Sequence, residues 1–244
     1  MRCIFDMEYT PGCALDIYLP DDETKAIFIY FHGGGLEAGD KRDANVFAPY
    51  LAAQGIALVS VNYRMYPTAR YPEFIEDAAL SVKWALDHMG EYTSCRKFFI
   101  GGSSAGGYLS MMLCFDGRYY AKLGIDPLLI SGYIHDAGQP TCHFNVLRER
   151  GIDSRRVIVD DSCALYHIGT QTEYPAMLFL VSDQDMKNRY EQTMLVISTL
   201  KHFGHEKNIH LKVLHGGHCH YVGRAPDGNG LSLGEMAAAF IESI

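Results

Sequence analysis

The sequence lacks the features that mark membrane, secreted or nucleic-acid-binding proteins. No uninterrupted apolar segment opens the chain, because Arg2, Asp6 and Glu8 interrupt a strand-like alternation near its start. There is no run of basic residues, and the formal net charge is -8. Binding to phosphate backbones needs clustered Lys and Arg. We therefore expect a cytoplasmic protein with neither nucleic acid nor an anionic membrane surface as a partner.

Paired cysteines and internal divisions are also missing. The seven cysteines contain no C-x-x-C pair, so we expect reduced thiols and neither a disulfide framework nor a zinc ribbon. No internal repeat, low-complexity tract or Pro/Gly/Ser-rich linker divides the 244 residues. A hydrophobic fraction of 48% with 20% charged residues is ordinary for a globular protein. These features predict a single domain over residues 1–244.

Apolar runs of strand length alternate with helical patterns along most of the chain. Predicted strands cover residues 2–9, 13–19, 26–31, 56–61, 98–100, 128–134, 176–181 and 209–214. Predicted helices cover residues 43–54, 72–89, 108–115, 188–203 and 231–244. Strands joined by helical crossovers predict an α/β fold, with a mainly parallel sheet of about eight strands and helices on both faces. Residues 135–173 break this rhythm and predict an insertion that is either a lid or substrate wall or an inert surface excursion.

A glycine-rich turn joins the predicted strand at 98–100 to the helix at 108–115. Its residues Gly102, Ser104 and Gly106 spell G-x-S-x-G, in which a serine sits on a strained strand-to-helix turn with its hydroxyl exposed. Ser103 is the rival nucleophile, but only Ser104 completes the pattern. The alternative is a phosphate-binding turn.

A second glycine run follows the predicted strand at 26–31. His32 precedes three consecutive glycines, which let backbone N–H groups approach a ligand oxygen. An HGGG sequence accompanies the serine turn in lipases and esterases, although alone it is equally compatible with a flexible turn. Arg64, after the strand at 56–61, is predicted to form a structural ion pair.

Candidate acids and bases follow the last two predicted strands. Asp183 and Asp185 come after the strand at 176–181, and His215, His218 and His220 come after the strand at 209–214. The order Ser, acid, His is the order of an α/β-hydrolase triad. Helix capping by the aspartates and metal binding by the histidines are alternatives. The histidine spacing lacks a helix or Cys-pair pattern, so we predict no metal site.

Together these motifs resemble the α/β-hydrolase superfamily, and within it the HGGG/GxSAGG esterase branch of hormone-sensitive-lipase-like and carbohydrate acyl esterases. Ser103 stands where many lipolytic relatives carry Asp, and the long amino-terminal cap helices of that branch are missing. The compact start and the His32 to Lys41 run look more like small acetyl or feruloyl esterases and arylformamidases.

The resemblance implies a role for each motif. Ser104 is the nucleophile and His218, directly after a glycine, is the base, with His215 and His220 as second choices. The Gly-x-x-Asp turn of relatives selects Asp185 over Asp183 as the acid. Backbone N–H groups of Gly33, Gly34 and Ala105 form the oxyanion hole. No cofactor is implied.

The function expected on this resemblance is that of a serine carboxylic ester hydrolase that removes short, acetyl-like acyl groups through an acyl-enzyme. The substrate is a small-molecule ester, for which an acetylated sugar is a candidate. The alternative is an arylformamidase or another amidase or peptidase of the same fold. The insertion carries polar groups that could hydrogen-bond sugar hydroxyls, namely Asp136, Gln139, His143, Asn145, Arg148, Glu149 and Arg150.

Overall fold

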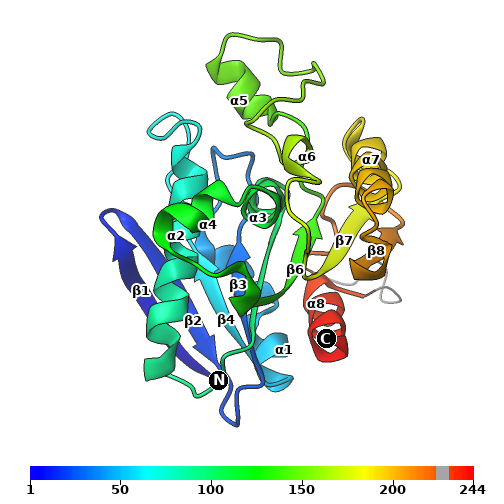
Figure 1. The fold of residues 1–244 in the computed structure, drawn as a ribbon. Coiled ribbons are helices and arrows are strands. Elements are labelled where there is room, and N and C mark those ends of the chain that lie inside the picture. Colours follow the sequence, from blue (N-terminus) through cyan, green and yellow to red (C-terminus); the bar gives the residue numbers. More distant parts are fainter. Residues whose placement is uncertain (224–230) are drawn as a thin grey trace.

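The chain is organised around one mainly parallel sheet, seen in a computed structural model that describes residues 1–223 and 231–244 (Figure 1). Eight strands of the described residues join it in the order β1-β2-β4-β3-β5-β6-β7-β8. They are β1 (Arg2–Thr10), β2 (Cys13–Leu19), β3 (Ala26–Phe31), β4 (Ile56–Val61), β5 (Phe98–Ser103), β6 (Ile130–Asp136), β7 (Ala176–Ser182) and β8 (Ile209–Leu214). β2 pairs antiparallel with β1 and β4, and the remaining pairs are parallel.

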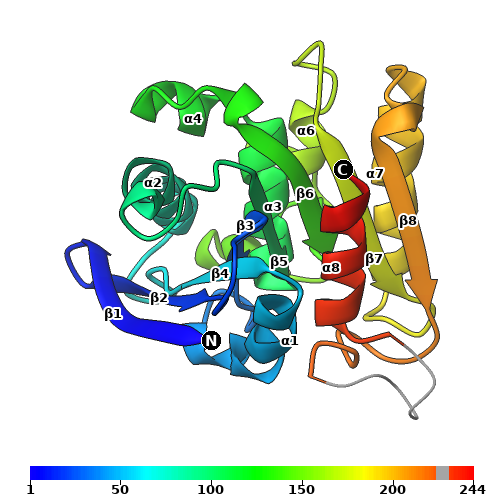
Figure 2. The same cartoon turned by 90° about the horizontal axis from the view of Figure 1, so that it is seen from below.

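Helices cover both faces of this sheet, as Figure 2 shows. The α-helices are α1 (Ala48–Ala53), α2 (Glu73–His88), α3 (Ala105–Phe115), α4 (Arg118–Leu123), α5 (Phe144–Glu149), α6 (Ala164–His167), α7 (Arg189–His202) and α8 (Leu233–Ser243). The 3-10 helices are η1 (Lys41–Val46), η2 (Met89–Glu91), η3 (Pro127–Leu129) and η4 (Glu206–Asn208). Apolar side chains of α2, α3 and α7 share one core cluster, and those of α1 and α8 share a second.

The central strands explain why the α/β prediction is confirmed. Every residue of β3, β4 and β5 is buried. Continuous apolar runs of this kind are typical of parallel strands that have helices on both faces. No helix among the described residues is both long and apolar enough to cross a membrane.

Several predicted element boundaries differ from the structure: β5 runs to Ser103 and α3 begins at Ala105, each three residues beyond the prediction. The helix predicted over 43–54 is η1 followed by α1, because Asp40 and Asp43 form a capping box on the short 3-10 helix and Phe47 leaves helical geometry before Pro49. The strand predicted over 128–134 is β6, which covers Ile130–Asp136 instead. It begins later because residues 127–129 form η3, which Pro127 opens and Asp126 caps by accepting the N–H of Leu128. His135 and Asp136 are thus strand residues, and the connection between β6 and β7 covers 137–175 rather than 135–173.

Arg64 forms the predicted structural ion pair. Its Nε and Nη2 donate to the two carboxylate oxygens of Asp77 at 2.8 Å each, and its backbone N–H donates to the same carboxylate at 3.0 Å. The Asp77 side chain is 1% exposed, whereas that of Arg64 is 41% exposed. The pair ties the segment after β4 to the buried face of α2.

Replacing Arg64 with methionine should lower the free energy of unfolding by about 3 kcal/mol, because the buried Asp77 carboxylate loses its cation. Urea unfolding followed by circular dichroism measures this change. Lys83→Met is the matched control, since Lys83 pairs with Asp87 on the exposed side of the same helix and should contribute less than about 1 kcal/mol. Equal losses in the two variants would show that the Arg64 pair contributes no more than an exposed one.

Candidate active site

The turn between β5 and α3 holds Ser104 in a strained conformation. Ser104 has φ +56° and ψ -110°, a backbone conformation that residues other than glycine rarely adopt. A Cβ at Gly106 would lie 1.9 Å from the carbonyl oxygen of Phe31, and one at Gly102 would lie 2.5 Å from the backbone of Gly106. The two glycines are therefore needed for the close approach of α3 to β3, and the turn has the geometry that the G-x-S-x-G pattern predicts.

Three side chains from distant segments meet at this turn. Nε2 of His218 lies 2.8 Å from Oγ of Ser104, and Nδ1 of the same ring lies 2.6 Å from Oδ1 of Asp185. The Asp185 side chain is fully buried. Burial alone would raise the pKa of Asp185, but its hydrogen bond with His218 and those from backbone N–H groups hold the pKa below its ordinary value. The imidazole thus bridges a hydroxyl and an ionised carboxylate.

The rival acid and histidines lie elsewhere. Asp183 is exposed, and its carboxylate lies 2.8 Å from Nδ1 of His215 and accepts the N–H of Gly216 at 3.0 Å. His220 bonds through Nδ1 to the carbonyl oxygen of Gly217 at 2.7 Å. Asp183 therefore braces the loop that carries His218. No group of three or more His, Cys, Asp or Glu in the described part of the chain could hold a metal ion.

The glycine loop after β3 lies against the serine turn. A Cβ at Gly33 would lie 3.1 Å from the carbonyl oxygen of Ser103 and 3.4 Å from Cβ of Ser104. Gly34 has φ +112°, and a Cβ there would lie 2.0 Å from the carbonyl oxygen of Ala38. Ala105 is the first residue of α3, whose N–H cannot bond within the helix. Gly33 and Ala105 thus lie beside Ser104, and Gly34 lines the same cavity as Ser104.

His32 and Tyr63 anchor this loop. Their rings stack with centroids 4.5 Å apart, and the Tyr63 hydroxyl donates to the carbonyl oxygen of His32 at 2.8 Å. Nδ1 of His32 also bonds to the carbonyl oxygen of Gly33 at 2.7 Å. Burial lowers the pKa of His32, so the ring is neutral near pH 7 and its role is structural.

The fold matches solved esterase structures over nearly the whole chain. The crystal structure of esterase B from Lactobacillus rhamnosis HN001 aligns with 99% of this chain and 84% of its own, with a TM-score of 0.78 and 17% sequence identity. Identity at this level speaks for the fold alone. The chain has the α/β-hydrolase fold. The fold that the motifs predicted is confirmed.

Sequence comparisons show that this chain is similar to esterases. The model of the BD-FAE family matches residues 15–123. Esterase LipI of Mycobacterium tuberculosis is 33% identical over 102 residues, which are 41% of this chain and 32% of LipI. Probable carboxylesterase 7 of Arabidopsis thaliana is 35% identical over 146 residues, which are 53% of this chain and 46% of that protein. The chain spans about a third to a half of the length of these relatives. The resemblance to the esterase branch is confirmed.

The buried carboxylate of Asp136 contacts the serine turn. Ser103 Oγ donates to Oδ2 of Asp136 at 2.5 Å and accepts from the Tyr30 hydroxyl at 3.0 Å. The Tyr221 hydroxyl donates to Oδ1 of Asp136, and the N–H of Ser104 donates to the Asp136 carbonyl oxygen at 2.8 Å. Burial raises the pKa of Asp136 to about 6, although the bonds from Ser103 and Tyr221 act to lower it. Asp136 thus fixes the turn by both its backbone and its side chain.

Sequence reasoning missed this role. Asp136 was expected among the polar groups that face the substrate, yet it is fully buried. It ends β6 directly opposite Ser103 in the register of β5 and β6. Placing the end of the strand two residues later would have put a carboxylate beside Ser103 and indicated the contact.

A cavity of about 570 Å³ opens above Ser104 at the carboxyl edge of the sheet. Its wall combines the glycine loop with apolar side chains of Tyr30, Phe144, Met186 and Val222, and it includes the carboxylate residues Glu37 and Asp43. Phe144 lies at the start of α5, where its ring covers Gly35. The connection between β6 and β7 therefore contributes to the wall of this cavity.

The polar groups expected to face the substrate lie elsewhere. None of the seven is among the described residues that line the Ser104 cavity. Asn145 donates to the carbonyl oxygen of Gly35 at 3.1 Å, and Arg148 pairs with Glu37, so both fasten α5 to the glycine loop. Arg150 pairs with Asp160 at 2.8 Å inside the connection. The expectation fails at the Ser104 cavity because these three side chains are held by the glycine loop or within the connection, whereas Gln139 lines a neighbouring cavity.

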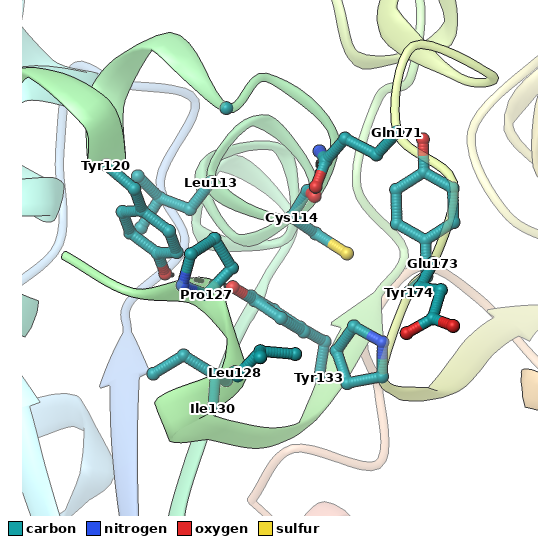
Figure 3. Close-up of a pocket in the computed structure, with 12 residues that line it drawn as sticks. Leu113, Cys114, Tyr120, Pro127, Leu128, Ile130, Tyr133, Gln171, Glu173 and Tyr174 are labelled. Carbon is teal, nitrogen blue, oxygen red and sulfur yellow. Dashed lines mark hydrogen bonds between the residues drawn. The ribbon is translucent and has the colours of Figure 1, made fainter.

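A smaller cavity of about 140 Å³ lies at the opposite edge of the sheet (Figure 3). Ile130 at the start of β6 and Pro175 before β7 line it together with Cys114 and Tyr133. Burial raises the pKa of the Cys114 thiol well above its ordinary value, so the thiol stays protonated. The Cys114 thiol is therefore a poor nucleophile at neutral pH.

Proposed function

We propose that this α/β-hydrolase is a serine carboxylic ester hydrolase that works through an acyl-enzyme on Ser104. The observation that carries the proposal is the position of the His218 ring, 2.8 Å from the Ser104 hydroxyl and 2.6 Å from the Asp185 carboxylate. A serine is a weak nucleophile until an adjacent base takes its proton, and the base needs a third group to orient it. The esterase relatives support the same reaction class.

In the proposed mechanism, Nε2 of His218 accepts the Ser104 proton as Oγ attacks the ester carbonyl carbon. Backbone N–H groups of Gly33, Gly34 and Ala105 stabilise the negative charge that develops on the carbonyl oxygen. The imidazolium then protonates the leaving alcohol, and an acyl-enzyme remains. Water, deprotonated by the same nitrogen, attacks the acyl carbon; the bond from this carbon to Oγ breaks, and the imidazolium returns its proton to Oγ as the acid leaves. Asp185 holds Nδ1–H throughout and stabilises the imidazolium.

The wall of the cavity supports a short acyl group and a polar alcohol. The Glu37 and Asp43 carboxylates line it beside the apolar side chains. Packing a fatty chain against carboxylates is costly, whereas hydroxyl groups of an alcohol can donate hydrogen bonds to them. An acetylated sugar therefore remains a candidate substrate. The groups that favour it are the carboxylates that follow the glycine loop, and not the polar residues of the β6–β7 connection.

Esters of one alcohol with acids of increasing length test this proposal. We expect kcat/KM for p-nitrophenyl acetate to exceed that for the octanoate by at least about tenfold, equivalent to ~1.4 kcal/mol of transition-state binding. An acetylated oligosaccharide should be deacetylated faster than a triglyceride is hydrolysed. A profile that peaks at octanoate would refute the short-acyl proposal, and faster cleavage of an arylformamide would assign the enzyme to amide chemistry.

A further inference from the structure

A second large cavity adjoins the one above Ser104. Its volume is about 580 Å³, and it lies between the connection after β6 and the start of α7. Phe144 and Met186 line both cavities. A substrate with its ester at Ser104 can therefore extend past these two side chains into the second cavity, which we call the Arg189 pocket.

Arg189 is the unusual member of this pocket. It is the first residue of α7, its exposed fraction is 4%, and its guanidinium donates to the carbonyl oxygen of Ala137. No carboxylate among residues 1–223 and 231–244 forms a direct ion pair with it, whereas Arg150 in the β6–β7 connection pairs with Asp160. Burial lowers the pKa of Arg189, although the charge of the Asp185 carboxylate acts to raise it. A buried cation that lacks a direct ion pair is costly, and a bound anion would offset part of that cost.

The rest of the wall is suited to an organic anion. Arg156 and Lys187 add exposed cations, while Phe144 and Val157 add apolar surface. Arg155 is already paired with Asp153, so it contributes less charge. A guanidinium presents parallel N–H donors that match the two oxygens of a carboxylate.

We infer that the Arg189 pocket is an anionic subsite, which binds a carboxylate on the substrate while the ester carbonyl lies at Ser104. This inference rests on the proposed ester hydrolysis and narrows its substrate class to esters that bear an acid group. The shared wall at Phe144 and Met186 favours a carboxylate of the substrate itself over a separate anion.

Matched pairs of acetate esters test the inference. Acetoxybenzoate, acetoxyphenylacetate and acetoxyphenylpropanoate place the carboxylate at increasing distance from the ester, and the carboxamide of each is its neutral partner. For at least one length, the wild-type enzyme should prefer the acid by about tenfold or more in kcat/KM, mainly through a lower KM. The double variant Arg156→Gln/Lys187→Gln and the single variant Arg189→Met should each lower this acid-to-amide ratio. Because Arg189→Met removes a buried contact and risks misfolding, the exposed double variant keeps the test decisive.

Lys201→Gln is the control for net charge, since Lys201 is exposed in the last turn of α7; its ratio should equal that of the wild type. Hydrolysis of neutral acetates with no acid preference at any length would overturn the subsite and leave the proposed function standing. An acid preference that survives in the double variant and in folded Arg189→Met would also overturn it. Protection of the folded protein by inorganic phosphate, with no acid preference, would assign the pocket to a separate anion and refute the substrate role. Absence of hydrolysis for every ester would overturn both proposals.

Discussion

Replacing Ser104 with alanine is expected to lower kcat for ester hydrolysis by about 10⁴-fold or more, because the acyl-enzyme cannot form without its hydroxyl. The fold should be retained. The side chain is only partly buried, and alanine is no more strained than serine at this backbone position, so the free energy of unfolding should change by less than about 1 kcal/mol. Steady-state kinetics with p-nitrophenyl acetate and a thermal unfolding curve measure the two quantities.

Ser103→Ala is the matched control. For this variant the structure predicts a larger loss of stability and a smaller loss of activity than for Ser104→Ala. Ser103 is buried, and its hydroxyl donates to Asp136. Removing it leaves a buried carboxylate oxygen without that donor, which should cost about 1–3 kcal/mol of stability. Activity should fall far less than in Ser104→Ala, because Ser104 keeps its backbone bond to the Asp136 carbonyl. A Ser103→Ala variant that is stable but inactive would show that the register of the turn has been misassigned.

Replacing Asp185 with asparagine should lower kcat by about 10³- to 10⁴-fold, because the amide can present an N–H toward Nδ1 of His218 and favour the wrong tautomer. Asp183→Asn should cost less than about tenfold. Its carboxylate bonds to His215 and to the N–H of Gly216, and those contacts brace the loop rather than the reacting atoms. The two variants differ by one atom from the wild type and lie two residues apart, so kcat measured side by side separates the roles. A larger loss in Asp183→Asn would contradict the assignment.

Much of the fold could be predicted because its central strands are almost entirely apolar. β3 and β4 are buried along their whole length, and Ser60 is the one small polar residue in β4. The serine turn could also be predicted. Gly102 and Gly106 must be glycines because an added Cβ at either position would lie less than 3 Å from backbone atoms. Where two backbone segments approach this closely only glycine fits, so the sequence itself indicates the contact.

The choice between Asp183 and Asp185 could not be made from residue chemistry alone. Both are aspartates on one turn after β7, and only the resemblance to esterases favoured Asp185. The structure separates them by burial: the Asp185 side chain is fully buried and faces His218, whereas Asp183 is 43% exposed. The side chain that contacts Asp185, His218, belongs to the loop after β8, which is remote in sequence.

The contacts of the connection between β6 and β7 were the least predictable. Its polar residues have no periodicity, so nothing in their order tells internal hydrogen bonds from contacts with a ligand. Asn145, for example, is fully buried and bonds to the glycine loop more than 100 residues earlier in the chain. Asp136 was predicted to belong to the connection for a related reason. A charged residue at the end of a buried strand is normally interpreted as the first residue of the following loop.

Mapping the covalent adduct of a serine-directed organophosphate such as paraoxon tests the central claim most directly. The proposal predicts that peptide mass spectrometry finds one phosphorylated residue, Ser104, that modification and loss of esterase activity proceed together, and that Ser104→Ala abolishes the adduct. An adduct on Ser103, or full esterase activity in protein that carries the adduct on Ser104, would contradict it.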